Sequence, residues 1–565
     1  MDPRPALSKT EISRSVMRRH EAMRAQRATW DTLWQDIANY VMPRKAQITN
    51  LTLQPSTEKQ DVLFDTTAIR ANMVLANGQL AWMTPHESRW FSFEPPAELD
   101  DNDEAKNWFK RCTEIAQAAL SRSNFYTEIH ELYLDRGAFG TACMFLEEGK
   151  RQPLLFDTWN VGLYSIAEDE EGTVDTVCRE FELTTIQAEE KFGEENLSPK
   201  LRKLYESSDV NNHLQKHWFI HCVYPREERD PQKVDGENMP FASVYIEKET
   251  RHVCRVGGYR ELPFFATRYL KWGSSAYGWS PSWVALPEAR QLNFLERQMD
   301  ALAELAAFPR VLVPSGMDGE IDLRAAGVTY YNPANPSAIP REWGTSGRYD
   351  IGQIRGDVRR KAIEEAFHVD LFQMFSRLDK QMTAREVGER SGEKLTQFSP
   401  TFTRMTTELF NPLLERVFSI LIRGGHFPQP PQSLLVQDPA SGEVFLPPPR
   451  MTFNSRIALA IRALETNSFA RHMDFLGSVA QMRPEVLDNY DMDRIARDLA
   501  RNEGLNADWM LDQKSVEETR ARRAAAAAQQ AQMEQAAEMA KAAAAVGKVP
   551  ADSPLMGAMG GALGL

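Results

Sequence analysis

The sequence lacks an excess of basic residues. Its 565 residues include 66 Lys and Arg but 79 Asp and Glu, which gives a net charge of −13 at pH 7. Proteins that grip DNA by neutralising its phosphates carry a positive surface, and much of their affinity comes from that charge. The composition therefore excludes a tight, phosphate-dependent DNA binder. Any contact with DNA is expected to be brief and non-adhesive.

Long apolar runs and closely paired cysteines are also missing. No stretch approaches the roughly 18 uninterrupted apolar residues of a membrane helix, and the N-terminus lacks the apolar core of a signal peptide. We therefore expect no membrane partner and a cytoplasm-like environment. The five cysteines are far apart and form no CxxC pair, which predicts buried thiols in a reducing compartment and no disulfide framework: Cys112, Cys143, Cys178, Cys222 and Cys254.

Motifs that would indicate catalysis are absent from the sequence. It contains no GxxxxGK[ST] phosphate loop, no HExxH pair and no GxSxG elbow. We therefore predict that the protein is not an enzyme and has no cofactor.

Two groups of residues were weighed as metal ligands. His213, His217 and His221 are spaced four apart and would share one helical face, but the bulky segment LQKHWFIHCVYPR favours a strand. Neighbouring histidines would then lie roughly 13 Å apart, too far for one ion. The acids Asp100, Asp101, Asp103 and Glu104 fit a solvated helix N-terminus better than a cation site. We predict no metal site.

The N-terminal half reads as mixed α and β structure. Helices are predicted over residues 8–42 and from Asp65 to the Thr84-Pro85 stop, a pair of helices over roughly 103–138, and a strand at 90–93. From Gly140 to Tyr269 the apolar period falls towards two, which indicates strands separated by turns. An aromatic set is assigned to the core in preference to a base-stacking platform: Trp30, Trp34, Trp82, Trp90 and Phe91.

Long helices dominate the C-terminal half. One is predicted from Pro281 to Phe308, a second from near Ile354 to about Phe375, and a third from the Thr383–Glu386 capping box to about Arg423. Pro400 and Pro412 should kink the third helix, since proline removes a backbone donor. Between the first two lies a Pro- and Gly-rich stretch with strand candidates RVLV and VTYY.

The C-terminus is rich in alanine and poor in large apolar side chains. A Pro-rich connector over 427–450 leads to a helical region at 455–510. The segment that follows has very high helix propensity but no core of its own, so it should pack on copies of itself or on other helices. Residues 547–565 are expected to be disordered.

Four segments resemble the head-to-tail connecting (portal) proteins of short-tailed bacteriophages. Their order and spacing extend over about 400 residues, although Phe398-Ser399 replaces the family's usual Leu-Gly before Pro400. The segments are WDTLWQDIANYVMPRK at 30–45, LFDTTAIRANMVLANGQLAWMTPHESRWFSF at 63–93, DRGAFGTACMFLEE at 135–148, and LDKQMTAREVGERSGEKL at 378–395 leading into ELFNPLLERVFSIL at 408–421.

The resemblance implies a mainly helical α+β portal fold and a ring of about twelve subunits. The implied regions are a wing at 1–280, stem helices at 281–308 and 351–375, a clip at 309–350, a tunnel loop at 376–382, a kinked helix and wing return at 383–450, a crown at 451–510 and a C-terminal barrel helix at 511–546.

The resemblance further implies a channel for genome packaging, retention and ejection at the head–tail vertex of a virion assembled in the host cytoplasm. The implied partners are the terminase packaging motor, tail adaptors, the major capsid and scaffolding proteins, and double-stranded DNA in transit. The implied tunnel-loop contacts are Ser376, Arg377, Leu378, Asp379, Lys380, Gln381 and Met382, and the candidate clip contacts are Arg310, Arg324, Arg341 and Arg348. The alternative is a helical scaffold or tail adaptor without a DNA channel.

Overall fold

The chain forms two units, residues 1–461 and residues 462–565. The structure, a computed structural model, describes residues 8–49, 63–99, 102–227, 229–230, 233, 235–308, 310–312, 341–343, 349–373, 398–437, 444–455, 472–473, 475–479, 483–502 and 513–546. Within these residues, each helix is too short or too polar to cross a bilayer.

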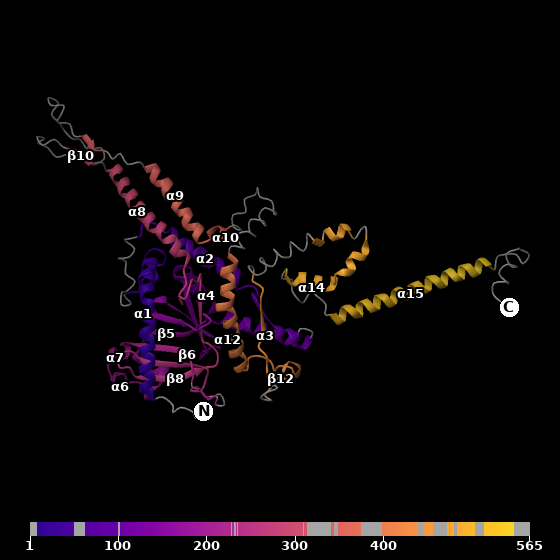
Figure 1. Ribbon diagram of the computed structural model, residues 1–565, viewed down its shortest axis with the longest axis horizontal. Helices are drawn as coiled ribbons and strands as arrows, with labels where there is room; N and C mark the ends of the chain where they lie inside the picture. The colour runs from indigo at the N-terminus through magenta and orange to yellow at the C-terminus, as the bar shows by residue number, and fades with distance from the viewer. Residues whose placement is uncertain are drawn as a thin grey trace, which may run out of the picture. The chain divides into compact units, whose positions relative to one another are not determined.

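Four helices open the first unit, and their limits agree with the sequence signals (Figure 1). Helix α1 (Lys9–Val41) begins at a capping box in which Ser8 and Glu11 satisfy each other's backbone N–H groups. Helices α2 (Thr67–Met83), α3 (Asp103–Arg122) and α4 (Phe125–Phe139) follow. Helix α4 ends at Gly140, whose φ of 77° suits glycine and whose Cα lies against the Gly278 backbone.

The main core packs these helices on a three-stranded antiparallel sheet. Its order is β3 (Leu155–Trp159), β2 (Thr141–Glu147) and β9 (Phe264–Arg268). Strand β2 is buried along nearly its whole length because α4 packs on it and both neighbouring strands pair with it. The predicted aromatic set lies here: Trp34, Trp90 and Phe91 are fully buried, and Trp30 and Trp82 pack at the edge of the core.

A five-stranded antiparallel sheet forms a second layer of the first unit. Its strands run in sequence order: β4 (Tyr164–Glu168), β5 (Val174–Thr184), β6 (Lys216–Pro225), β7 (Phe241–Glu247) and β8 (Val253–Tyr259). The N-terminal half of α1 packs on one face through Val16, Met17 and Met23. Helices α5 (Thr185–Phe192) and α6 (Pro199–Tyr205) cover the other face, and the short α7 (Val210–Leu214) lies beside them.

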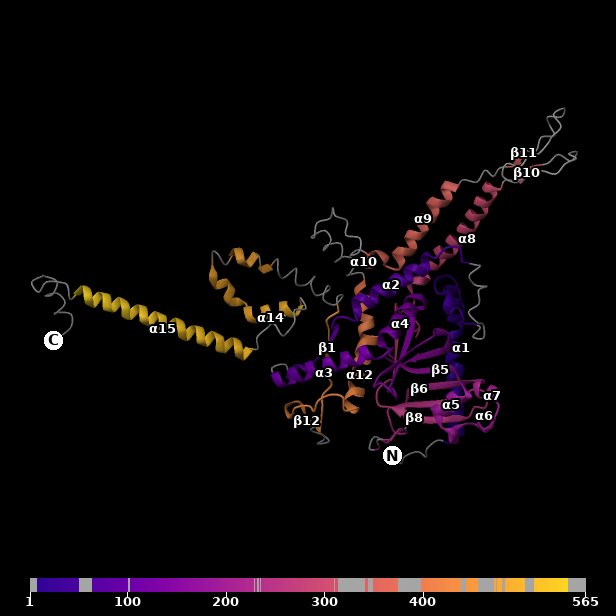
Figure 2. The same cartoon turned by 180° about the vertical axis from the view of Figure 1, so that it is seen from behind.

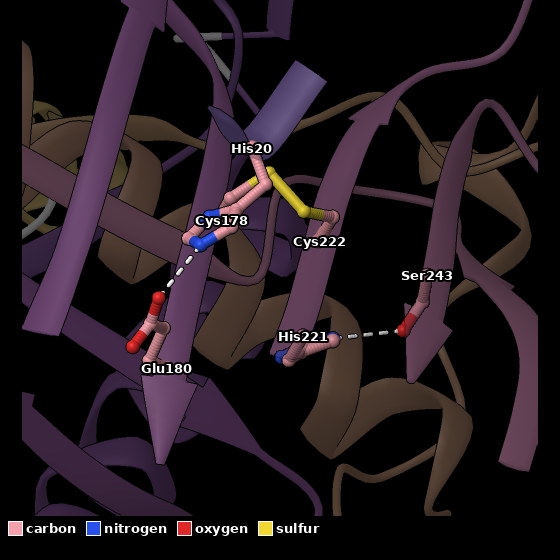
Figure 3. Close-up of a disulfide and its surroundings, with 6 residues drawn as sticks. All are labelled: His20, Cys178, Glu180, His221, Cys222 and Ser243. Carbon is pink, nitrogen blue, oxygen red and sulfur yellow. Dashed lines mark hydrogen bonds and ion pairs between the residues drawn. A yellow bond between two sulfur atoms is a disulfide. The ribbon is translucent and has the colours of Figure 1, made fainter. Parts of the chain in front are cut away.

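The prediction that all five cysteines are thiols is wrong for one pair. The register of β5 and β6 places Cys178 directly opposite Cys222, with their Cα atoms 4.1 Å apart, and the two form a disulfide (Figure 3). Their separation of 44 residues hid this pairing, because only the strand register brings them together. The other three cysteines are buried thiols, and burial raises the pKa of Cys112 and Cys254 to about 12.

A buried carboxylate lies two residues beyond the disulfide on the same face. Glu180 accepts a hydrogen bond from His20 of α1 at 2.8 Å and pairs with Lys248 at 2.7 Å (Figure 3). Burial alone would raise the pKa of Glu180, but the hydrogen bonds from His20 and Lys248 and the charges of Lys248 and Arg24 outweigh it and lower the pKa to about 2. The ionised Glu180 therefore ties α1 to the sheet at ordinary pH.

The chain returns to the main core after residue 398. Residues 398–405 are helical, Thr406–Phe410 form a π-helical turn, and α12 (Asn411–Arg423) continues from it. The π turn directly precedes Pro412, as expected where a proline removes a backbone donor. The predicted capping box at Thr383–Glu386 lies outside the described residues.

Short strands complete the first unit. Strand β14 (Arg450–Phe453) pairs antiparallel with β1 (Phe91–Glu94), and β12 (Val436–Gln437) pairs with β13 (Val444–Phe445). Residues 450–453 thus extend the strand pairing of the first unit.

The second unit is helical in its described parts. Helix α14 (Met492–Asn502) and the 34-residue α15 (Gln513–Val546) are joined by an ion pair in which Arg520 Nη2 donates to Asp493 Oδ1 at 2.7 Å. The side chains of Met533 and Met539 are 71% exposed, so α15 buries little against the described chain. The predicted helix is present, and the tail beyond residue 546 lies outside the described residues.

The disulfide determines how many cysteines an alkylating reagent can modify. Alkylation of the protein under denaturing conditions without a reductant should modify three cysteines, and five after reduction, as read by intact-mass spectrometry. Cys178→Ser frees Cys222, so this variant should show four modified cysteines without reductant. Five modified cysteines in unreduced wild-type protein would show that the bond does not form.

Candidate functional site

Two long helices run side by side away from the main core (Figures 1 and 2). Helix α8 (Pro281–Ala307) begins with Pro281 at its first position, and the Ser280 hydroxyl accepts from the Trp283 N–H at 3.1 Å. Helix α9 (Tyr349–Ala366) returns antiparallel to it. It starts five residues earlier than predicted and ends sooner, because His368 adopts a φ of 53° before the short α10 (Val369–Gln373).

Close contacts and ion pairs hold α8 against α9. Arg359 Nη1 donates to Glu288 Oε2 at 2.6 Å, and Arg360 pairs with Glu296. Near the other end, Gly352 lies directly against the Met299 side chain, so a larger residue there would require Met299 to move. Glu288 thus lies beside Arg359, whereas Met299, later in α8, lies beside Gly352, earlier in α9, as expected for an antiparallel hairpin.

The base of the hairpin is fastened to the main core. Asn293 of α8 is buried, and its Oδ1 accepts from the backbone N–H groups of Phe64 and Asp65 at 2.8 and 3.1 Å. The Asp65 carboxylate in turn pairs with Arg360 of α9 at 3.2 Å. Both helices thus share one anchor at the start of α2, and bending at the base is restrained.

Apolar side chains remain exposed on both helices. On α9, Ile351, Ile354 and Val358 recur at spacings of three and four residues and are 45%, 64% and 66% exposed. Val284 and Phe294 of α8 are 59% and 66% exposed. Water-facing apolar groups at helical spacing form a stripe suited to contact with another protein surface.

The structure describes only part of the predicted clip. Strands β10 (Arg310–Leu312) and β11 (Arg341–Trp343) pair antiparallel at the far end of the hairpin. The pairing brings the backbones of Arg310 and Arg341 into one small ribbon. Strand RVLV was predicted and β11 was not. Arg324, Arg348 and the VTYY candidate lie outside the described residues.

All the predicted tunnel-loop residues lie outside the described residues as well. They are Ser376, Arg377, Leu378, Asp379, Lys380, Gln381 and Met382. Their flanks are described: α10 ends at Gln373, and Phe398 is buried beside Phe372 with ring centroids 5.7 Å apart.

The three spaced histidines do not share one site. His213 lies in α7 and donates from Nε2 to the Tyr205 carbonyl at 2.9 Å, whereas His217 and His221 lie on β6. His221 hydrogen-bonds to Ser243 Oγ at 3.0 Å and stacks on Tyr245 (Figure 3). Of the acidic group, Asp103 and Glu104 are exposed in the first turn of α3, and Asp100 and Asp101 lie outside the described residues.

A family model described as bacteriophage head to tail connecting protein matches residues 13–511. The chain belongs to this family. It is accordingly a head–tail connecting protein, a structural component and not an enzyme, which confirms the resemblance found in the four sequence segments.

Relatives of this connecting protein are similar along nearly their whole length. A probable portal protein of Bordetella phage BPP-1 is 31% identical over 517 residues, 90% of each chain. The portal protein of Salmonella phage epsilon15 is 26% identical over 530 residues, 92% of each chain. Among solved structures, the neck of an empty gene transfer agent (GTA) particle is 9% identical, with a TM-score of 0.36, and the match covers 74% of this chain and 90% of that one.

Sequence reasoning missed the exposed stripe on α9. Ile351, Ile354 and Val358 show regular helical spacing, but spacing alone does not tell a core-facing stripe from an uncovered one. Asn293 was also missed, since nothing in the sequence around it indicates that its side chain accepts from two backbone N–H groups of a distant segment.

The anchor at the hairpin base yields a stability prediction. Asn293→Leu keeps the branched shape of the side chain but leaves the N–H groups of Phe64 and Asp65 without an acceptor, so it should lower the free energy of unfolding by about 2 kcal/mol or more. Thermal unfolding measures the change. Gln298→Leu, at an exposed position of the same helix, serves as the control and should unfold like the wild type. Equal stability of the two variants would contradict the anchoring role.

Proposed function

We propose that this connecting protein assembles into a closed ring whose channel carries double-stranded DNA during genome packaging, retention and ejection. The observation that supports the proposal best is the exposed apolar stripe on the α8–α9 hairpin. In a ring every hairpin has a neighbour on each side, so apolar residues on outward faces become buried between copies.

The size of the stripe is sufficient to favour association. Burying one Ile or Val side chain contributes about 1.5–3 kcal/mol. Ile351, Ile354 and Val358 are each about half exposed or more, and Val284 and Phe294 add to them. The anchor through Asn293 and Asp65 holds the hairpin in one orientation, so little ordering cost opposes docking.

The net charge suits transit of a polyanion. With a charge of −13 per chain, a ring would not grip phosphates at every step, and mild repulsion would keep DNA centred in the channel. Local attraction would then come from the few basic residues near the channel. We assign this role to Arg377 and Lys380 of the tunnel loop.

The remaining regions follow from the same assignment. Residues 1–280 form the wing, 309–350 the clip, 376–382 the tunnel loop, 451–510 the crown and 511–546 the barrel helix. The clip, with Arg310, Arg324, Arg341 and Arg348, meets the terminase motor during packaging and tail adaptors afterwards. The ring assembles in the host cytoplasm with capsid and scaffolding proteins and remains at the head–tail vertex of the virion. The exposed, Ala-rich α15 suits packing against its own copies.

Assembly should depend on the stripe. Val358→Glu places a charge where two copies would meet, so it should shift the protein from rings to smaller species in native mass spectrometry and negative-stain images. Val210→Glu is a matched control, since Val210 on α7 is 65% exposed and Val358 is 66% exposed. Rings of unchanged stoichiometry with Val358→Glu would remove the stripe from the interface. A wild-type protein that stays monomeric would favour the scaffold or adaptor alternative.

The tunnel-loop assignment is tested by DNA retention. The double substitution Arg377→Gln and Lys380→Gln removes two positive charges without shortening the loop. We expect rings of normal size and filled heads that lose DNA faster on storage, measured as the fraction of DNA accessible to nuclease over time. Wild-type retention in this variant would show that these charges do not contact the DNA.

A further inference from the structure

The strand register gathers three potential metal ligands at one edge of the five-stranded sheet. Phe219 of β6 lies opposite Glu247 of β7, and the Lys248 N–H donates to the Trp218 carbonyl at 2.9 Å just beyond the ladder. Side chains alternate along both strands, so His217 and Glu247 project from the same face of the sheet, and Glu249 lies in the turn that follows β7. One ligand atom from each of the three lies within 4.8 Å of the others.

The hydrogen bonds of His217 leave one ring nitrogen available. Its Nε2 lies 3.3 Å from Thr185 Oγ1, and that hydroxyl donates its single proton to the Asn212 carbonyl at 2.8 Å. Thr185 Oγ1 therefore acts as acceptor, which puts the imidazole proton on Nε2 and leaves the Nδ1 lone pair for a ligand.

Glu247 has a buried carboxylate of which only one oxygen is hydrogen-bonded among the described residues. It is 1% exposed, and its Oε2 accepts from Thr250 Oγ1 at 2.7 Å. Its Oε1 is buried and, among the residues that the structure describes, meets no hydrogen-bond donor. A buried carboxylate oxygen with no partner is costly, and a cation at this point would remove the cost.

Glu249, the third potential ligand, already forms an ion pair with a lysine of helix α6. Lys200 of α6 lies 2.6 Å from Glu249 Oε1, with side chains 45% and 67% exposed. Exposed pairs of this kind contribute little to stability, so a metal ion can displace the ammonium group at small cost.

We propose that His217, Glu247 and Glu249 bind a divalent transition-metal ion, with Zn²⁺ the best match. One imidazole and two carboxylates are ligands that Zn²⁺ accepts, and a water molecule would complete a four-coordinate shell. The ion joins β6 to the turn between β7 and β8, so it fastens the outer edge of the wing sheet. The site requires no second copy of the chain and is independent of the proposed channel.

Zinc binding to the full-length, chelator-stripped protein tests the proposal. Isothermal titration and metal analysis after gel filtration should give one Zn²⁺ per chain, with a higher unfolding temperature in the loaded protein. Glu249→Gln should weaken binding by at least about tenfold. Lys200→Met should strengthen it, because the competing ammonium group is gone. The nearby pair Lys216 and Glu182 supplies the control: Glu182→Gln should bind Zn²⁺ like the wild type.

A further variant separates this site from thiol binding. Cys254 is buried on the same side of the sheet, so Cys254→Ser should retain stoichiometric Zn²⁺ if His217 and the two glutamates are the ligands. Loss of binding in Cys254→Ser, unchanged binding in Glu249→Gln, weaker binding in Lys200→Met, or no stoichiometric Zn²⁺ on the wild type would each overturn the proposal.

Discussion

The main core depends on one buried guanidinium. Arg268, at the end of β9, is 3% exposed and pairs with Glu168 of β4 and with Glu408 of the π-helical turn, the latter at 2.8 Å. Burial alone would lower the pKa of Arg268, but hydrogen bonds and charge from Glu408 and Glu168 outweigh it and raise the pKa. Removing Arg268 would take from both carboxylates a partner that is withdrawn from water, so the guanidinium holds the three segments together. They are about 100 and 140 residues apart in sequence.

A second buried arginine reinforces this closure. Arg136 of α4 is fully buried, donates to the carbonyls of Arg268 and Thr401 at 3.1 and 3.2 Å, and lies over the Tyr269 ring. Burial lowers its pKa to about 10, which still leaves it charged at ordinary pH. The segment that follows the hairpin is therefore fixed to the core that precedes it. This closure, with the Asn293 anchor, is what lets α8 and α9 extend from a rigid base.

Because the base of the hairpin is rigid, the apolar side chains on its outer surface stay exposed. A flexible hairpin could fold its apolar residues back onto the wing, but the ion pairs of Arg359 and Arg360 and the close fit at Gly352 fix one face of each helix inward. Ile354 and Val358 are consequently left outward. Ring assembly, as proposed, would complete the burial that a single chain leaves unfinished.

The sequence by itself determined most of the local structure and the family. Caps and periodicity placed α1, α2, α4 and α8 close to their observed limits, because Ser8, Gly140 and Pro281 act through neighbouring backbone groups. Tertiary structure alone decided the long-range pairings: Cys178 with Cys222, β1 with β14, His217 with Glu247 and Glu249, and Arg268 with Glu408. Each of these depends on strand register or on the return path of the chain, and no short-range pattern encodes either. The same reason explains why α9 could be predicted as a helix while its exposed stripe could not be told from a buried one.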